Sequence, residues 1–292
     1  MTEAKVALVT GASRGAGKGI AIGLGKKGMT VYVTDRSTQA GQVKNWDGTP
    51  LPGTVAETAA EITAAGGTGI AVMCDHSDDA QVAALFSQIQ KEQGRLDILV
   101  NNAAFIHHEL ISQKPFWEKE LSAQGIMDVG LRSAYVASWY AAQIMAKQKS
   151  GLIAMGSSFG ASCYMHGPAY GAQKAGLDKM AHDMAVDLKP FNVTALSLWM
   201  GPLITERALI AAEVHPEQYK EFIATAETPQ FIADIVYAIA TDPKAEEISG
   251  HTLITAEVAR DRYNITDRDG QQPPSYREAL GSPNPPNPAA VY

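Results

Sequence analysis

The segment that decides the fold reads AKVALVTGASRGAG, at residues 4–17. Its first seven residues form a short apolar run, as in a buried strand, and a glycine-rich turn follows. Residues 18–27 carry apolar side chains at helical spacing, and a second apolar run at 29–34 ends at Asp35. This order of strand, glycine-rich turn, helix, strand and acid predicts the first βαβ unit of a fold that binds a dinucleotide.

The glycine-rich turn has the residues that a phosphate site needs. Gly11, Gly15 and Gly17 would let the backbone approach a pyrophosphate, whose charge is favoured at a helix N-terminus. Asp35 could accept hydrogen bonds from the adenosine ribose. A tight turn between strand and helix without a ligand is the alternative interpretation.

Strand and helix patterns alternate along the rest of the chain. Strands are expected at 69–75, 95–104, 151–158, 192–198 and 250–257, and helices at 54–65, 77–93, 118–148, 170–189 and 228–243. The alternation predicts an α/β fold with a Rossmann-type, doubly wound parallel sheet of seven strands and helices on both faces. Residues 37–56, rich in Gly, Pro and Thr, are expected to form a long surface loop.

The chain is expected to contain one dinucleotide-binding catalytic domain over residues 1–260 and an extended proline-rich tail over 261–292. The tail is too polar and too rich in proline to build a core of its own. It either stays loose or lies extended on another surface, such as that of a neighbouring subunit.

Composition excludes several classes of protein. The net charge of −7 argues against a nucleic-acid surface, which needs clustered positive charge. Cys74 and Cys163 are too far apart for a C-x-x-C metal pair. No apolar run reaches membrane-spanning length, and the N-terminus lacks a signal-peptide pattern. A cytoplasmic protein that binds no membrane is therefore expected.

Tyr170 and Lys174 lie four residues apart in an expected helix, which places them on one face. Free tyrosine has a pKa of about 10. An ammonium about 4 Å from the phenol would favour the phenolate by roughly 4 kcal/mol at an effective dielectric of about 20, or about 3 pKa units. The pair therefore predicts a tyrosine acid/base with a pKa near neutrality. A surface helix pair is the alternative.

Four motifs occur in chain order: Thr10-Gly11-x-x-x-Gly15-x-Gly17, Asn101-Asn102-Ala103, Ser157 and Tyr170-x-x-x-Lys174. With them the chain resembles the short-chain dehydrogenase/reductase family over about residues 4–257. The long loop after the second strand, LSLWMGPLITE at 196–206 and the carboxy-terminal run are similar to its dehydrogenase/reductase member-one-like branch.

The resemblance implies an NAD(P)-dependent oxidoreductase that interconverts a secondary alcohol and a ketone or aldehyde by hydride transfer. It implies that Tyr170 exchanges the proton, Lys174 lowers the pKa of Tyr170 and holds the nicotinamide ribose, and Ser157 hydrogen-bonds the reacting oxygen. A homo-oligomer, either a tetramer or a dimer, is implied as well. The alternative is a dinucleotide-binding sensor or interaction subunit without turnover.

The resemblance also implies a set of cofactor contacts. These are Thr10, Gly11, Ser13, Arg14, Gly15, Gly17, Asp35, Arg36, Asp75, Asn101, Ala103, Tyr170, Lys174, Leu203 and Thr205. NAD is favoured, because a carboxylate at Asp35 would repel a 2′-phosphate. NADP stays possible, because Arg14 and Arg36 stand where NADP-using relatives place cations.

The chain departs from the family pattern at two catalytic segments. Gly130 takes the place of the usual asparagine, whose backbone carbonyl supports a water linked to the lysine. Glycine keeps that carbonyl, so the water relay is expected to survive. Met200-Gly201-Pro202 stands where Pro-Gly is usual, which could alter the backbone over the nicotinamide.

Two other chemistries compete for residues near these motifs. Gly156-Ser157-Ser158-Phe159-Gly160 spells the G-x-S-x-G pattern of a hydrolase, with Ser158 as nucleophile, but no helix is expected directly after it. His107, His108, Glu109 and His166 could suggest a metal site, but the sequence shows no further ligand at sensible spacing. No metal is expected; His107 or His166 could instead contact substrate.

A lipophilic substrate is expected from the apolar residues that should meet beyond the carboxyl ends of the strands. The candidate pocket residues are Phe105, Phe159, Tyr164, Met165 and Trp199. Ordinary core packing is the alternative for Trp199 and for part of the others.

Overall fold

The structure is a computed structural model that describes residues 4–45, 48–287, 289 and 291. Within these residues one sheet has seven strands, β1 to β7: Val6–Thr10, Thr30–Asp35, Thr68–Met73, Ile98–Asn101, Gly151–Ser157, Val193–Trp199 and Thr252–Ile254. The strand order is β3-β2-β1-β4-β5-β6-β7, and all neighbouring strands are parallel. The predicted Rossmann-type sheet is confirmed.

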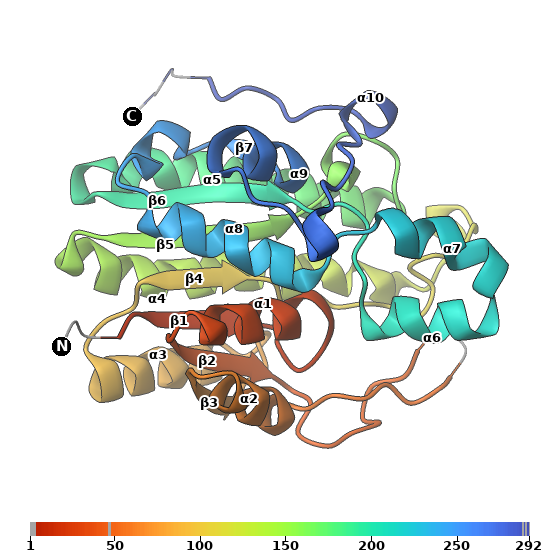
Figure 1. Cartoon of the computed structure of the whole chain (residues 1–292), viewed down its shortest axis with the longest axis horizontal. Coiled ribbons are helices and arrows are strands. Elements are labelled where there is room, and N and C mark those ends of the chain that lie inside the picture. The colour runs from red at the N-terminus through yellow and green to blue at the C-terminus, as the bar shows by residue number, and fades with distance from the viewer. Residues whose placement is uncertain (1–3, 46–47, 288, 290, 292) are drawn as a thin grey trace.

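Helices cover both faces of this sheet (Figure 1). The helices α1 to α10 are Gly15–Lys26, Val55–Ala64, Asp79–Gln93, Ser133–Gln148, Pro168–Leu188, Glu206–Val214, Pro216–Thr225, Pro229–Thr241, Thr255–Val258 and Arg277–Leu280. Side chains of α1, α2 and α8 form one core layer, and those of α3, α4 and α5 form the other. None of these helices, in the described part of the chain, is long and apolar enough to cross a bilayer.

The two core layers follow from strand periodicity. In β1, Ala7 and Val9 face α1 and α8, whereas Val6 and Leu8 face the opposite layer. Because both faces are covered, the central strands read as continuous apolar runs. The strand order reverses between β1 and β4, which creates a crevice at the carboxyl ends of these strands.

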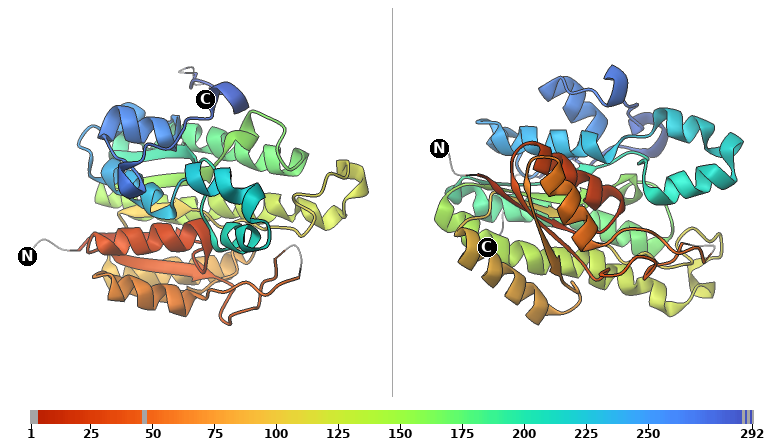
Figure 2. Two further views of the ribbon diagram at one scale, coloured as in Figure 1. Left: turned by 45° about the vertical axis from the view of Figure 1, so that its right-hand side comes forward. Right: turned by 60° about the horizontal axis from the view of Figure 1, so that its bottom comes forward.

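Three segments project at this carboxyl end of the sheet (Figure 2). They are the loop after β2, the segment between β4 and α4, and the pair α6–α7. The sequence pattern predicts no helices at the positions of α6 and α7. Its strand at 250–257 was too long, because the chain turns into α9 at Thr255.

The helix predicted over 118–148 is wrong in its first half. The chain forms short turns and becomes regular helix only at Ser133. Gly130 interrupts it with a φ of 146°, a conformation that favours glycine. The N–H of Gly130 donates to Ser133 Oγ (3.0 Å), and its carbonyl accepts from Gln173 Nε2 (3.1 Å). These side chains replace the helical bonds that the break removes.

The proline-rich tail lies against its own chain. Gln272 donates to the Ala256 carbonyl (3.2 Å), and Arg277 forms an ion pair with Glu257 (2.5 Å). The Tyr276 ring packs edge-on against Phe159, with ring centroids 6.2 Å apart. This part of the tail therefore covers the end of the sheet near β5 and β6.

Candidate active site

The glycine-rich turn is closed by backbone contacts that leave no room for side chains. A Cβ on Gly11 would lie 2.7 Å from the Ala103 Cα, and one on Gly17 would lie 2.4 Å from the Gly11 carbonyl oxygen. Gly11 and Gly15 also have φ values of 65° and 60°. The turn thus brings bare backbone to the N-terminus of α1, where the helix dipole favours an anion.

A carboxylate already lies at this helix N-terminus. The Gly15 N–H donates to Glu206 Oε2 over 2.7 Å. Helix α1 has no acidic residue in its first turn and no side-chain cap of its own. The Glu206 carboxylate, which comes from the start of α6, therefore stands in for a bound anion. This contact indicates that the residues present fit the pyrophosphate of a dinucleotide.

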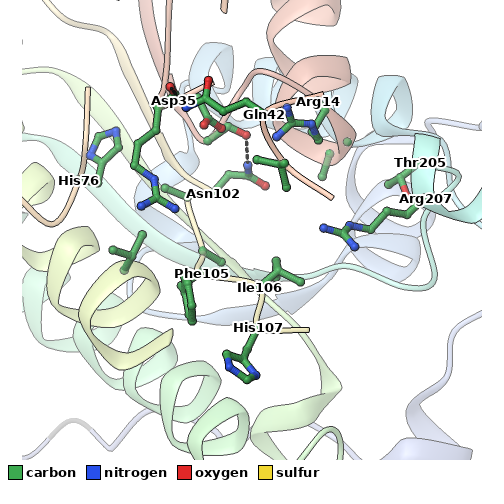
Figure 3. A pocket seen from close by; sticks show the side chains of 18 of the residues that line it. Arg14, Asp35, Gln42, His76, Asn102, Phe105, Ile106, His107, Thr205 and Arg207 are labelled. Carbon is green, nitrogen blue, oxygen red and sulfur yellow. Dashed lines mark hydrogen bonds between the residues drawn. The ribbon is translucent and has the colours of Figure 1, made fainter. Parts of the chain in front are cut away.

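A cleft of about 610 Å³ opens in front of the turn (Figure 3). Many of the predicted cofactor residues line it: Gly11, Arg14, Gly15, Asp35, Arg36, Asp75, Ala103 and Thr205. Ser13 and Thr10 are buried behind the turn, and Leu203 packs against the core. The loop after β2 and the start of α6 border the same cleft, which is large enough for an extended ligand.

The charged side chains of Asp35 and Arg14, which line the cleft, make hydrogen bonds to neighbouring residues. Asp35 accepts hydrogen bonds from Ser13 Oγ and from the Ser37 N–H, each with a donor–acceptor distance of 3.0 Å. The Arg14 guanidinium donates to the carbonyls of Pro52 and Gly53, each at a distance of 2.9 Å. Arg14 therefore holds the loop after β2 in place.

Arg36 is less constrained. It lies 3.7 Å from the Asp75 carboxylate, and its side chain is 55% exposed. The Asp75 carboxylate also accepts from Ser77 N–H and Oγ, and these bonds help to lower its pKa. The pair thus places one exposed cation and one hydrogen-bonded anion at the edge of the cleft.

The structure corrects the predicted role of Asn101. Its side chain points away from the cleft, toward Ser138 in α4, and donates to Ser138 Oγ (2.9 Å). Asn102 lines the cleft instead and donates to the carbonyls of Thr10 and Gly11, both over 3.0 Å. Adjacent residues at a strand end face opposite sides, so the first asparagine is buried and the second supports the glycine turn.

The same alternation of side-chain direction also changes the position predicted for Ser157. Its hydroxyl is buried and donates to the Lys174 carbonyl (3.2 Å), so the structure does not bring it to the Tyr170 hydroxyl. Ser158 Oγ lies 2.9 Å from Tyr170 Oη instead. The serine beside the tyrosine is therefore Ser158.

Ser158 does not have the geometry of a hydrolase nucleophile. Its φ of −161° is ordinary extended backbone, and only a three-residue turn follows. The hydroxyl contacts Tyr170 and accepts from the Gly160 N–H (3.3 Å) rather than facing an imidazole base. The G-x-S-x-G match is a coincidence of composition.

Tyr170 and Lys174 lie on one face of α5, as their spacing predicts. Lys174 Nζ is 5.3 Å from the centre of the Tyr170 ring and donates to the Gly156 carbonyl (2.9 Å). Burial lowers the pKa of Lys174 to about 8. Burial also raises the pKa of Tyr170, against the effect of the Ser158 hydrogen bond. The expected lowering of the Tyr170 pKa is wrong for the free protein, because desolvation of the phenol dominates.

Comparison with known proteins decides the family. The model of the short chain dehydrogenase family matches residues 5–212. This chain belongs to the short-chain dehydrogenase/reductase family. Dehydrogenase/reductase SDR family member 1 of Mus musculus is 38% identical over 285 residues, which cover 94% of this chain and 86% of that protein. The 3-oxoacyl-[acyl-carrier-protein] reductase of Synechocystis is 32% identical, over 86% of this chain and 94% of its own length.

Solved structures of short-chain dehydrogenases have the same fold. A putative short-chain alcohol dehydrogenase from Sinorhizobium meliloti superposes with a TM-score of 0.70 at 26% identity, over 87% of this chain and 95% of its own. A metagenomic short-chain oxidoreductase in complex with NADP gives a TM-score of 0.66 at 27% identity, over 86% and 96%.

Beside Tyr170 the chain has an apolar pocket of about 130 Å³. Residues 105–126, which follow β4, supply most of its walls, including Phe105, Leu110, Phe116 and Ile126. His166 completes the wall at Tyr170, with ring centroids 4.9 Å apart. Phe105 and His107 line both this pocket and the large cleft, so the two cavities adjoin.

Only Phe105 among the predicted pocket residues lies in this pocket. Phe159 and Trp199 are buried and pack on each other, with ring centroids 5.2 Å apart, and Met165 packs against the same cluster. Tyr164 is 82% exposed. These four residues do not line the pocket: Phe159, Trp199 and Met165 form a small core cluster on which the tail residue Tyr276 packs, whereas Tyr164 points to solvent.

His107, His108 and Glu120 bring three possible metal ligands together, which the sequence did not reveal. The hydrogen bonds of His107 do not suit a metal. Its Nδ1 accepts from the Glu109 N–H (3.1 Å), so the proton lies on Nε2, which faces Ser122 Oγ at 3.0 Å. A ligating imidazole instead donates through its second nitrogen. The cluster is therefore a hydrogen-bonded group at the border between the pocket and the large cleft.

Sequence reasoning missed three contributors to the site: Ser158, Asn102 and Glu206. The first two adjoin residues that were named, and only the direction of the strand end distinguishes the neighbours. Glu206 follows Thr205, which caps α6 by accepting from the Ala208 N–H (3.4 Å). An acid in the first turn of a helix is common, so its sequence position carried no signal for the cleft.

Proposed function

We propose that this protein is an NAD(P)-dependent oxidoreductase that interconverts a secondary alcohol and a ketone or aldehyde by hydride transfer, with Tyr170 as the acid/base. One observation carries the proposal. The Tyr170 hydroxyl, paired with Ser158, borders an apolar pocket that adjoins the cleft in front of the glycine turn. A carbonyl in the pocket would meet a proton donor on one side and the cofactor cleft on the other.

The cofactor, when bound, would supply the hydride. The glycine turn would bind its pyrophosphate, Asp35 its adenosine ribose, and Lys174 its nicotinamide ribose. NAD is favoured, because Asp35 lines the cleft as a carboxylate while the Arg14 donors are taken by the loop after β2. The NADP bound by the metagenomic relative and the exposed Arg36 support NADP as the alternative.

The proton chemistry follows from the surroundings of Tyr170. Burial raises the pKa of Tyr170, so the phenol is protonated at neutral pH and has a proton to donate to a carbonyl oxygen. A general acid works best with a pKa near the working pH, so the Lys174 ammonium would have to offset this effect. Ser158, 2.9 Å from the phenol oxygen, can hydrogen-bond the same substrate oxygen. The Lys174 ammonium beside the ring would stabilise the phenolate that forms as the proton leaves. Ser157 would act indirectly, because its hydroxyl donates to the backbone carbonyl of Lys174 and so helps to position that residue.

A lipophilic carbonyl compound is the proposed substrate class. The pocket beside Tyr170 has mainly apolar walls, and Phe116 is 61% exposed at its edge. Burial of apolar surface there would provide most of the binding free energy.

We propose a homo-oligomer, either a dimer or a tetramer, as the working state. Tyr135 and Trp139 on α4 are each about half exposed, which is unusual for large aromatic side chains outside an interface. Light scattering of the purified protein, with Trp139→Glu as the disrupting variant, tests this state.

Titration with NADH and NADPH, followed by a panel of lipophilic ketones, tests the function. The parent should bind one reduced cofactor and oxidise it with a ketone. Tyr170→Phe should bind that cofactor equally well and lose roughly 10²–10⁴ in turnover. Cofactor binding without turnover that depends on Tyr170 would instead make the chain a dinucleotide-binding sensor.

A further inference from the structure

Glu227 connects to the segment that follows β6 through three hydrogen bonds. Its N–H donates to the Pro202 carbonyl (2.8 Å), and its carbonyl accepts from the Ile204 N–H (2.9 Å). Its side-chain oxygen Oε2 accepts from the Gly201 N–H (3.1 Å). The side chain is buried, with the residue 2% exposed. One residue thus fixes the course of the chain from Gly201 to Ile204.

This segment leads directly into the cofactor cleft. It begins after Trp199 at the end of β6 and ends at Thr205, which lines the cleft. Glu206 follows and contacts the glycine turn. Under the proposed function the segment lies at the nicotinamide end of the site, so its position affects how the cofactor binds.

The hydrogen bonds around Thr255 indicate where a proton lies. Thr255 Oγ1 is 3.0 Å from the Trp199 carbonyl oxygen, and it lies 2.7 Å from Glu227 Oε1 and 3.0 Å from Oε2. A hydroxyl has one proton to donate. If Thr255 donates it to Trp199, the short contact with Glu227 is a hydrogen bond only when Glu227 is itself protonated.

The protonated form satisfies every polar partner at this point. Glu227 donates to Thr255, Thr255 donates to the Trp199 carbonyl, and Glu227 Oε2 still accepts from Gly201. The ionised form would draw the Thr255 proton to the carboxylate and leave the Trp199 carbonyl without this donor. Buried polar groups lose stability when a partner is removed in this way.

Burial and a neighbouring carboxylate favour the neutral form of Glu227. Burial, the largest cause, raises the pKa of Glu227 to about 7; the Asp267 carboxylate acts in the same direction, while the hydrogen bonds from Thr255 and from the Gly201 N–H act against it. Asp267 is held by the Thr228 N–H and hydroxyl. From the tail, the Tyr276 ring approaches Gly201, where a Cβ would lie 3.6 Å from Tyr276 Cε2.

We infer that Glu227 is a positioning residue for the cofactor, and that its neutral form is the one that supports binding. The inference rests on the proposed function. Ionisation places a negative charge beneath the segment that a negatively charged cofactor must contact, and it breaks the Thr255 bond that fixes the end of β6. Cofactor affinity therefore falls as Glu227 loses its proton.

The test is a fluorescence titration with NADH or NADPH at several values between pH 6 and pH 8.5. In the parent, Kd should rise with pH, by up to about tenfold if cofactor binding shifts the pKa of Glu227 by one unit. In Glu227→Gln, which keeps a hydrogen-bonding side chain but cannot ionise, this rise should be lost. Glu221→Gln, a change on the exposed surface of α7, is the matched control and should behave as the parent.

An equal rise of Kd in Glu227→Gln and the parent would overturn the inference, and so would a Kd that is flat in both. Thermal unfolding separates this failure from failure of the proposed function. A carboxyl whose pKa is raised on folding lowers stability increasingly as pH rises from its unfolded to its folded pKa, and the full cost is present above the folded pKa. Glu227→Gln should therefore melt higher than the parent at pH 8.5 and by less at pH 6. If the gap in melting temperature depends on pH in this way but neither cofactor binds, the proposed function and the cofactor role are refuted together. If the gap is the same at both pH values, Glu227 does not titrate in this range.

Discussion

The Glu206 carboxylate accepts a 2.7 Å hydrogen bond from the Gly15 N–H, at the N-terminus of α1. A dinucleotide pyrophosphate would need the same backbone donors. The two anions cannot share these donors, so we expect the Glu206 side chain to leave them when a cofactor binds. In this structure the first residue of α6 therefore occupies a donor that the proposed ligand would use.

Removal of this competitor should tighten cofactor binding. Because a hydrogen bond with one charged partner contributes about 1.5–3 kcal/mol, Glu206→Ala should lower the Kd for the reduced cofactor by roughly tenfold. Fluorescence titration measures the effect. Glu213→Gln, an exposed change later in α6, is the control and should leave Kd unchanged. Weaker binding by Glu206→Ala would mean that the carboxylate helps the bound state instead.

Substitution of the two serines at the end of β5 should lower kcat to very different extents. Ser158→Ala removes the hydroxyl beside Tyr170 and should lower kcat by roughly 10²–10³, as expected for a donor to the reacting oxygen. Ser157→Ala removes a bond to the Lys174 backbone and should cost less than about tenfold. Steady-state kinetics with one ketone compares them. The reverse order would return the catalytic role to Ser157.

Gly130→Asn should harm the protein rather than improve it. The φ of 146° is unfavourable for any residue with a side chain, and a Cβ would lie 3.3 Å from the Gln173 side chain. We expect a loss of roughly 1–3 kcal/mol in the free energy of unfolding. Denaturant unfolding measures it, with Gly270→Asn, where a Cβ meets nothing, as the control for positive φ. A stable variant with higher turnover would contradict the account of the broken helix.

Burial of the Lys174 ammonium should lower the free energy of unfolding, although the proposed chemistry needs this residue. Its pKa falls on folding from 10.5 to about 8 because it is buried. The resulting cost is fully present below pH 8 and is relieved as pH rises from 8 toward 10.5. Lys174→Met should therefore raise the free energy of unfolding at pH 7, by on the order of 1–3 kcal/mol, while turnover is lost. A destabilised variant at pH 7 would show that the lost hydrogen bond to Gly156 outweighs the burial cost.

Asp35 should set the choice between the two cofactors. Asp35→Ala removes the carboxylate at the expected ribose site and should shift the ratio of NADH to NADPH affinity toward NADPH by roughly tenfold. Parallel titrations of parent and variant measure this ratio. Asp35 also accepts hydrogen bonds from Ser13 and Ser37, one on each oxygen, so Asp35→Asn, which keeps one acceptor oxygen without the charge, is the control. A parent that already prefers NADPH would refute the proposed NAD preference.

Much of the fold was predictable because it depends on local pattern. Apolar runs, helical spacing and the glycine-rich turn follow from residues that are near neighbours in the chain. Positions that depend on distant contacts were not predictable. Phe159 became core because Tyr276, more than a hundred positions later, packs on it. The helix through Gly130 broke because side chains of Ser133 and Gln173 supply its hydrogen bonds.

The sequence by itself determined the alternating sheet, the glycine-rich turn and the shared helix face of Tyr170 and Lys174. Only the tertiary structure decided which of two adjacent residues meets these groups: Ser158 rather than Ser157 lies beside Tyr170, and Asn102 rather than Asn101 contacts the glycine turn. It also decided that Glu206 reaches the glycine turn. The reason is physical. Periodicity fixes the backbone conformation, but the side on which a residue at a strand end projects, and the group that it meets there, depend on how distant segments pack.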